Sequence, residues 1–309
     1  MKKFSMLLFF VVAMLTLASC GGTAKKEAKT EEGKECCLPI GLQLYSVRDD
    51  MAKDFKGTLQ KVKEMGYDGV EFAGMYDHTP AEIKAMCAEI GLNPISAHVP
   101  LQEMLEDIDK VIADYKAIGC QYIVVPYVTE ERRPGGELFK QMVEEIRGIG
   151  EKCKAAGLVL LYHNHDFEFA KTETGEFGLD YLYANVPADL LQTELDQCWV
   201  KYAGQDPVAY LQKYEGRSPV VHLKDYYASG EQKEDPYALI GLNEGEKKEN
   251  TAFEFRPLGY GVQDIPAIIE ASKKAGSKWL IVEQDQPSMG KTPMECAAMS
   301  MEYLKNGKK

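Results

Sequence analysis

The chain has 309 residues, of which 36 are basic and 48 are acidic, and its formal net charge is −12 at pH 7. A chain this acidic repels the phosphate backbone of nucleic acids, so we expect no nucleic-acid partner. Its eight cysteines contain no CxxC pair, which argues against a cysteine zinc site and against a disulfide framework.

The N-terminal segment has the pattern of a bacterial lipoprotein signal. Two lysines precede a short apolar stretch, which closes with Leu-Ala-Ser-Cys at residues 17–20. We expect a signal peptide over residues 1–19 and lipidation of Cys20, with an ordinary secretory signal as the alternative. Most of residues 20–38 are small or charged without an apolar period, which is typical of a flexible tether. We predict that the protein lies in the cell envelope and faces the periplasm. A lipid anchor in the outer membrane would be its only contact with a membrane.

Residues 39–309 alternate short apolar runs with longer helical patterns, as expected of one large domain. Two helical segments begin with Thr-Pro-x-Glu, at residues 79–82 and 292–295, which combines a capping threonine, a proline in the first turn and a glutamate three residues after the cap. Residues 206–207, Asp-Pro, offer a similar start for a shorter helix. Eight apolar runs have strand character. They are Ile40–Tyr45, Gly69–Phe72, Pro94–His98, Tyr122–Val125, Leu158–His163, Leu191–Leu195, Val220–Leu223 and Trp279–Val282.

Eight strands that alternate with helices predict parallel pairing through right-handed crossovers, and eight is the number that closes into a barrel. No GxGxxG pattern follows the first strand and no P-loop pattern occurs, so an open doubly wound sheet is the weaker alternative. We predict a single-domain α/β fold, the (β/α)8 TIM barrel. The segment Tyr226–Pro257 is too long for a plain barrel loop, and we expect it to fold partly over the mouth, a disordered surface insert being the alternative.

Histidines mark the ends of predicted strands. The chain has five, and four of them stand where an apolar run stops: His98, His163, His165 and His222. The densest case is LVLLYHNHDFEF, residues 158–169, in which a predicted strand runs into two histidines and an aspartate. TIM-barrel active sites lie at the carboxyl ends of the strands, so we expect these side chains at one mouth. The other polar residues at predicted strand ends are Gln43, Tyr45, Glu71, Tyr127, Glu194, Asp196, Lys224, Asp225, Glu283 and Asp285.

Four consecutive predicted strands, the fifth to the eighth, end in side chains that can bind a metal: His163, Asp196, His222 and Glu283. Convergence of these side chains on the barrel axis would form a cage of nitrogen and oxygen donors. A mixed cage with open positions suits one Mn²⁺, Zn²⁺, Co²⁺ or Fe²⁺ ion, whereas the imidazoles make Mg²⁺ less favoured. The alternative is a set of solvated or hydrogen-bonded strand ends without an ion.

The chain from about Ile40 to Leu304 resembles the xylose isomerase-like TIM barrels, the sugar phosphate isomerase/epimerase superfamily, as a bacterial lipoprotein member. The similar stretches are GLQLYSVRD, GYDGVEFAG, YHNHDFEF, ELDQCWVKYAGQDPVAYLQKYEGRSPVVHLKD, and PLGYGVQD followed by LIVEQD. In that family a metal is held by an acidic or histidine residue closing strand five, an aspartate closing strand six, a histidine of strand seven and a glutamate of strand eight. The resemblance therefore implies the same four ligands as the strand ends above.

Two departures from the family pattern bear on the reaction. The epimerases of the family place a glutamate at the position of His163, where it works with the strand-eight glutamate as a pair of acid/base groups. A metal-bound imidazole cannot easily serve as that base, so the pattern here is closer to the dehydratase branch. Trp199 stands where many members have a histidine that contacts substrate. An indole there can stack on a sugar ring, with ordinary packing as the alternative.

We predict a metal-dependent enzyme of the isomerase/epimerase type that removes the α-proton of a keto sugar or keto glycoside and forms an enediolate stabilised by the metal. The alternatives are elimination from a 3-keto glycoside, as in a lyase or dehydratase, and a sugar-binding lipoprotein without catalysis.

The predicted catalytic residues are Glu283, His165 and Lys224, because the last two lie two residues beyond a ligand on the same strand face. Their alternative is an orienting role, in which His165 holds Asp196 or Glu194 and Asp225 is paired to Lys224 or Arg48. An oligomer is compatible with the sequence. The predicted substrate-binding residues are Tyr45, Glu71, His98, Glu194 and Trp199.

Overall fold

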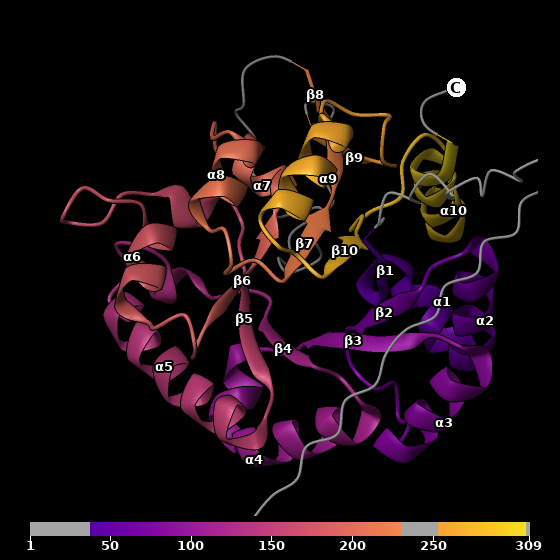
Figure 1. The fold of residues 1–309 in the computed structure, drawn as a ribbon, viewed down its shortest axis with the longest axis horizontal. Helices are drawn as coiled ribbons and strands as arrows, with labels where there is room; N and C mark the ends of the chain where they lie inside the picture. The colour runs from indigo at the N-terminus through magenta and orange to yellow at the C-terminus, as the bar shows by residue number, and fades with distance from the viewer. Residues whose placement is uncertain (1–37, 230–252, 307–309) are drawn as a thin grey trace, which may run out of the picture. The chain divides into compact units, whose positions relative to one another are not determined.

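The computed structural model describes residues 38–229 and 253–306. In this part of the chain eight parallel strands close into a barrel, with helices around it (Figure 1). The order around the barrel is β1-β10-β7-β6-β5-β4-β3-β2. The prediction of a single TIM barrel domain is confirmed. The barrel strands are β1 (Ile40–Gln43), β2 (Gly69–Phe72), β3 (Asn93–His98), β4 (Tyr122–Val125), β5 (Val159–His163), β6 (Gln192–Asp196), β7 (Val220–Leu223) and β10 (Trp279–Val282).

Three helices, α3, α8 and α10, begin where the capping signals predict. In α3 the hydroxyl of Thr79 accepts the backbone N–H of Glu82 at 3.3 Å, and the Glu82 carboxylate accepts the N–H of Thr79 at 2.8 Å. Asp206 caps α8 by accepting the N–H of Val208 at 2.9 Å. The helices are α1 (Arg48–Lys53), α2 (Phe55–Met65), α3 (Pro80–Ile90), α4 (Leu101–Ile118), α5 (Phe139–Ala156), α6 (Gly178–Asn185), α7 (Gln197–Tyr202), α8 (Pro207–Lys213), α9 (Ile265–Lys274) and α10 (Pro293–Asn306), with 3-10 turns η1 (Leu44–Val47), η2 (Glu130–Arg132) and η3 (Phe167–Phe169).

The barrel interior is a packed apolar layer that lies directly beneath the polar strand ends. Alternate residues of a strand point to the same side, so His163 shares the inner face of β5 with Leu161, and His222 shares that of β7 with Val220. This layer closes the barrel below the histidines and makes the carboxyl ends the floor of a site. The buried residues of the layer are Ile95, Tyr122, Val124, Leu161, Val220 and Ile281.

The first strand is shorter than the sequence predicts. It ends at Gln43, and residues 44–47 form a 3-10 turn in place of two further strand residues. The side-chain oxygen of Gln43 accepts the backbone N–H of Tyr45 at 2.9 Å, which turns the chain immediately after the strand. Tyr45 therefore lies on a turn at the mouth and not on the strand.

The ends of the long segment after β7 form a second, two-stranded sheet that the strand pattern missed. β8 (Asp225–Ala228) pairs antiparallel with β9 (Phe253–Arg256) in a register that places Tyr226 opposite Phe255. The alternation in FEFR is the signal that could have found it. Residues 230–252 of this segment, on which the expected cover over the mouth depends, lie outside the described residues.

Cys20, the expected signal peptide and nearly all of the expected tether also lie outside the described residues, which begin at residue 38. Within the described ranges, no helix is both long enough and apolar enough to cross a membrane.

Candidate metal centre and active site

The four predicted ligands meet at the carboxyl ends of β5, β6, β7 and β10. One donor atom from each of His163, Asp196, His222 and Glu283 lies within 4.8 Å of the others, and all four residues are buried. Nε2 of His163 lies 3.6 Å from Oδ2 of Asp196 and 4.0 Å from Oε2 of Glu283. Nδ1 of His222 lies 3.0 Å from the same Glu283 oxygen. We call these four residues the outer cage.

Asp196 shows that the outer cage fits a cation. Its Oδ1 accepts the N–H groups of Cys198 and Trp199, at 2.7 and 3.4 Å, and so caps α7. Its Oδ2 is buried and accepts no hydrogen bond from the described residues. Burial raises the pKa of this carboxyl to about 6, despite the nearby Lys224 ammonium. A buried carboxylate oxygen beside two imidazoles matches the donors that a divalent transition metal or zinc prefers.

Lys224 lies against the outer cage as a buried ammonium group. Its Nζ lies 2.6 Å from Asp285, 2.9 Å from Glu283 and 3.3 Å from Asp196. Burial alone would lower the lysine pKa, but these three carboxylates raise it well above its ordinary value. Lys224 therefore carries a proton at neutral pH, so it can act as an acid or as a positive charge and not as a base.

The suggested pairing of Asp225 with Lys224 or Arg48 is wrong. The Asp225 carboxylate accepts four backbone N–H groups, from Tyr226, Gly259, Gly261 and Gln263, at 2.9 to 3.0 Å. It therefore ties β8 to the loop after β9. Arg48 donates to the backbone carbonyls of Tyr45 and Asp285.

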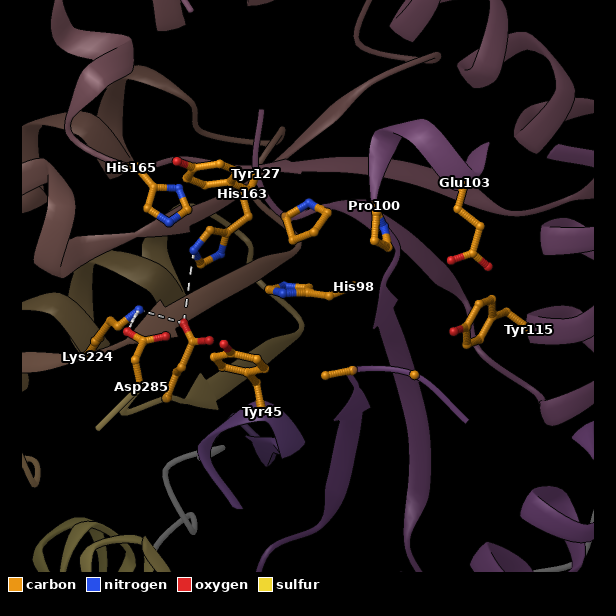
Figure 2. Close-up of a pocket in the computed structure, with 14 residues that line it drawn as sticks. Tyr45, His98, Pro100, Glu103, Tyr115, Tyr127, His163, His165, Lys224 and Asp285 are labelled. Carbon is orange, nitrogen blue, oxygen red and sulfur yellow. Dashed lines mark hydrogen bonds and ion pairs between the residues drawn. The ribbon is translucent and has the colours of Figure 1, made fainter. Parts of the chain in front are cut away.

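A cavity of about 360 Å³ opens beside the outer cage. Figure 2 shows His163, His165, Lys224 and Asp285 at one end of this cavity, and Glu103 at the other. Glu103 and its neighbour Tyr115 belong to α4 and were not predicted, because nothing in an amphipathic helix marks the residues that face a cavity. The lining residues are Tyr45, Ala73, Gly74, His98, Pro100, Glu103, Tyr115, Pro126, Tyr127, His163, His165, Lys224, Glu283 and Asp285.

His165 lines the cavity as a neutral imidazole. Burial, together with the Lys224 ammonium, lowers its pKa well below the ordinary value. The ring lies parallel to that of Phe167, at 5.3 Å between centroids. Its backbone N–H is held at 2.8 Å by Glu168, a buried carboxyl that the sequence reasoning missed. Burial raises the pKa of Glu168 to about 8, so this carboxyl is largely protonated at neutral pH. In the sequence, only its position three residues after His165 indicates that it contacts the site.

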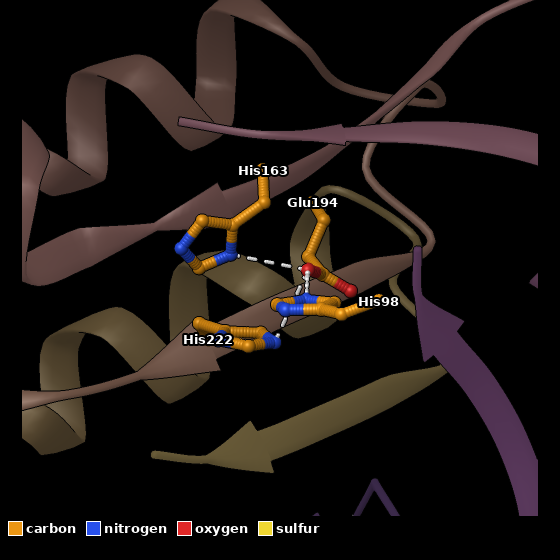
Figure 3. Close-up of side chains that lie close together, drawn as sticks. All are labelled: His98, His163, Glu194 and His222. Carbon is orange, nitrogen blue, oxygen red and sulfur yellow. Dashed lines mark hydrogen bonds and ion pairs between the residues drawn. The ribbon is translucent and has the colours of Figure 1, made fainter. Parts of the chain in front are cut away.

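A second group, here called the inner cluster, extends from the cavity wall at His98 down to Glu71 and Glu194 and includes one ring nitrogen each of His163 and His222. Figure 3 shows its members other than Glu71. Nε2 of His98 lies 2.7 Å from Glu194 and 3.1 Å from Glu71. Burial opposes a charge on His98, but the two carboxylates raise its pKa to about 10. Of the predicted substrate-binding residues, His98 and Tyr45 line the cavity, whereas Glu71 and Glu194 lie fully buried below it.

Trp199, the remaining predicted substrate-binding residue, is also fully buried and does not line the cavity. Its indole lies parallel to Phe253 and edge-on to Phe255, in a cluster that joins α7 to the β8–β9 sheet. The Lys224 ammonium lies 5.4 Å from the centroid of the indole. These contacts fit the packing alternative, with a cation–π contact to a site residue in addition.

The comparisons with known proteins agree with this architecture. A family model described as xylose isomerase-like TIM barrel matches residues 59–307. No curated protein matches the chain. A solved sugar phosphate isomerase/epimerase from Parabacteroides distasonis is similar, with 22% identity over 92% of this chain and 98% of that chain, and a TM-score of 0.68.

Two further solved structures share the fold at lower identity. The probable 3-DHS dehydratase AsbF of Bacillus anthracis has 16% identity over 88% of this chain and 100% of that chain, with a TM-score of 0.69. The IOLI protein, solved with a zinc atom, has 17% identity over 87% of this chain and 98% of that chain, with a TM-score of 0.64. Because the family model covers most of the sequence, the chain belongs to the xylose isomerase-like TIM barrel family.

Proposed function

We propose that this protein is a divalent-metal-dependent enzyme of the isomerase or epimerase type, which removes an α-proton from a keto sugar or keto glycoside. The observation that carries the proposal is one shared cavity. It is lined by two residues of the outer cage, by the neutral imidazole of His165 and by the ammonium of Lys224. A neutral imidazole accepts a proton and an ammonium stabilises negative charge, so the groups needed for α-proton chemistry lie together.

Each group has a distinct part in the proposed reaction. A divalent cation in the outer cage would supply a Lewis acid for the substrate carbonyl. His165 takes the α-proton, because its lowered pKa leaves a ring nitrogen without a proton at neutral pH. Lys224 keeps its positive charge beside Glu283 and stabilises negative charge that develops on the substrate oxygen. His163 directs Nε2 at the cage, so it is a ligand and not the base.

Elimination is the second candidate, and the position of Lys224 favours it. An ammonium beside the cage can protonate a leaving oxygen once the α-proton has been removed. In addition, His163 on β5 takes the place of one of the two carboxylates that epimerases of the family use. The names of the solved neighbours include both an isomerase/epimerase and a probable dehydratase, so the fold is compatible with either outcome.

The charges around the cavity favour an uncharged substrate. Among the described residues that line it, three are acidic, namely Glu103, Glu283 and Asp285, and the single lysine or arginine is Lys224, already paired with carboxylates. This lining repels phosphate. We propose that a lipid anchor at Cys20 places the enzyme in the cell envelope, where uncharged glycosides and keto sugars are available.

The test is NMR of the metal-loaded protein with 3-keto glucosides and with free keto sugars in D₂O. Exchange of the α-proton with solvent, with an epimer or isomer as product, supports the main proposal. An eliminated product supports the lyase reaction. Asp196→Asn is the matched inactive variant, because it neutralises one ligand and keeps the side-chain shape. Sugar binding without exchange, unaffected by chelators, contradicts both reactions and identifies a sugar-binding protein.

A further inference from the structure

Glu194 lies at the centre of the inner cluster, with a single oxygen facing three imidazoles. Its Oε2 lies 2.7 Å from Nε2 of His98, 3.1 Å from Nδ1 of His163 and 3.3 Å from Nε2 of His222 (Figure 3). The residue is fully buried on the inner face of β6, two positions before Asp196. The period of two along a strand therefore aims both carboxylates at the same histidines, one below them and one above.

We propose that Glu194 is a positioning residue that selects the tautomers of these imidazoles and thereby creates the metal site. A carboxylate only accepts hydrogen bonds, so each ring nitrogen that faces Oε2 carries a proton. In a neutral imidazole the other nitrogen then keeps its lone pair. For His163 that nitrogen is Nε2, and for His222 it is Nδ1, which are the two atoms that face Asp196 and Glu283 in the outer cage.

Glu71 supports only part of this arrangement. Its Oε1 lies 2.8 Å from Nε2 of His222 and 3.1 Å from Nε2 of His98, and it is held by the side-chain amide of Gln43 at 2.7 Å. No contact joins Glu71 to His163 among the described residues. Among the described residues, Nε2 of His222 therefore has two carboxylate acceptors, whereas Nδ1 of His163 has Glu194 alone. The tautomer of His163 should therefore respond most to the loss of Glu194. A substitution of Glu71 serves as the control, because Glu71 does not contact His163 among the described residues.

A second cation in the inner cluster is the competing interpretation. Donor atoms of His98, His163, Glu194 and His222 also lie within 4.8 Å of one another, and Oε1 of Glu194 has no hydrogen-bond partner in the described part of the chain. Simultaneous occupation of both positions would require His163 and His222 to bind metal through both ring nitrogens. Each ring would then have to lose its remaining proton. Hydrogen bonds to Glu194 need no such loss, which favours the positioning role.

The inference rests on the proposed metal site and can be tested on the full chain with zinc alone. The five histidines permit ¹⁵N-histidine labelling and direct NMR assignment of each tautomer. In the wild-type protein we expect one zinc per chain, with His163 protonated at Nδ1 and His222 at Nε2. Glu194→Leu removes the acceptor and should lower zinc affinity by about 10- to 100-fold, with His163 in both tautomers.

Two variants make the result specific. Glu194→Gln retains a carbonyl oxygen, so it should restore the His163 tautomer and part of the affinity. It also remains informative if the leucine variant fails to fold. Glu71→Leu should leave His163 unchanged. Two zinc ions per wild-type chain, a His163 protonated at Nε2, or a Glu194→Gln protein that shows both His163 tautomers would overturn the proposal. If wild-type protein binds no zinc while His163 remains protonated at Nδ1, the proposed metal function fails and the role of Glu194 stands.

Discussion

The outer cage and the inner cluster share two imidazoles and differ in what faces them. In the inner cluster, the ring nitrogens of His163 and His222 lie within 3.3 Å of a carboxylate oxygen. In the outer cage, Nδ1 of His222 also faces a carboxylate, at 3.0 Å from Glu283, but Nε2 of His163 lies 3.6 Å from Oδ2 of Asp196, an oxygen that accepts no hydrogen bond from the described residues. The inner cluster thus gives each facing ring nitrogen a carboxylate that accepts its proton, whereas the outer cage also offers a carboxylate oxygen for a cation, although both are built from the same residue types.

Asp196→Asn is expected to have the largest effect, because it removes the charge from a buried cage oxygen that accepts no hydrogen bond from the described residues. We expect metal affinity to fall by more than the roughly 10- to 100-fold typical of an outer partner, and activity to disappear. Metal content after dialysis and titration calorimetry measure this. Asp206→Asn is the matched control, since Asp206 caps α8 as Asp196 caps α7 but lies outside both metal-capable clusters. Equal metal binding by both variants would show that the outer cage is not the metal site.

His165→Asn separates catalysis from metal binding. We expect kcat to fall by about 10²- to 10⁴-fold, as for loss of a general base, with zinc affinity unchanged. Because the pKa of His165 is lowered, kcat of the metal-saturated wild-type protein should persist as pH falls through the ordinary histidine range. His78→Asn is the control, since His78 packs against Phe55 and does not line the cavity. Full activity of His165→Asn would show that another group is the base.

The pH dependence of metal affinity should expose the competition for His222. Burial lowers its pKa, but Glu194, Glu71 and Glu283 raise it well above the ordinary value, so metal-free His222 carries a second proton at neutral pH. A cation at Nδ1 must displace that proton, and affinity should therefore rise with pH until His222 is deprotonated.

The same shift predicts the stability of the metal-free protein. Because the pKa of His222 is raised in the folded protein, its contribution to the free energy of unfolding is complete below the pKa of the unfolded state. This contribution is lost as pH rises through the pKa of the folded state. Urea unfolding of the metal-free protein at several pH values measures this stability. Proton release on zinc binding is measured separately, by calorimetry in buffers of different ionisation enthalpy. Zinc binding that releases no proton at neutral pH would contradict the assignment of His222 as a ligand.

Trp199→Phe is expected to have the smallest effect on function. The indole is fully buried against Phe253, so we expect a loss of about 1–2 kcal/mol in the free energy of unfolding, less than the 3–5 kcal/mol typical of Trp→Ala. KM should not change. Trp279→Phe, at the start of β10 and away from the cavity, is the matched control. An increase in KM without loss of stability would instead favour sugar stacking by Trp199.

The residues of the outer cage were predictable because strand periodicity is a local property. His163, Asp196 and His222 each end an apolar run, and parallel strands bring their carboxyl ends to one mouth whatever the details of packing. Glu71 and Glu194 have the same sequence signature as a residue at the mouth, yet they lie below it. Their depth depends on the register between strands, such as Glu194 opposite His163, and on the ring of His98 above them.

The sequence alone determined the TIM barrel, the starts of α3, α8 and α10 and the residues of the outer cage, because apolar periodicity, capping residues and strand ends act over a few neighbouring positions. Only the tertiary structure decided the protonation of Lys224, the neutrality of His165 and the role of Glu194 beneath the cage. Each of these depends on charges brought together from distant strands and on their burial, and neither the distances nor the loss of solvent is encoded in any single stretch of the chain.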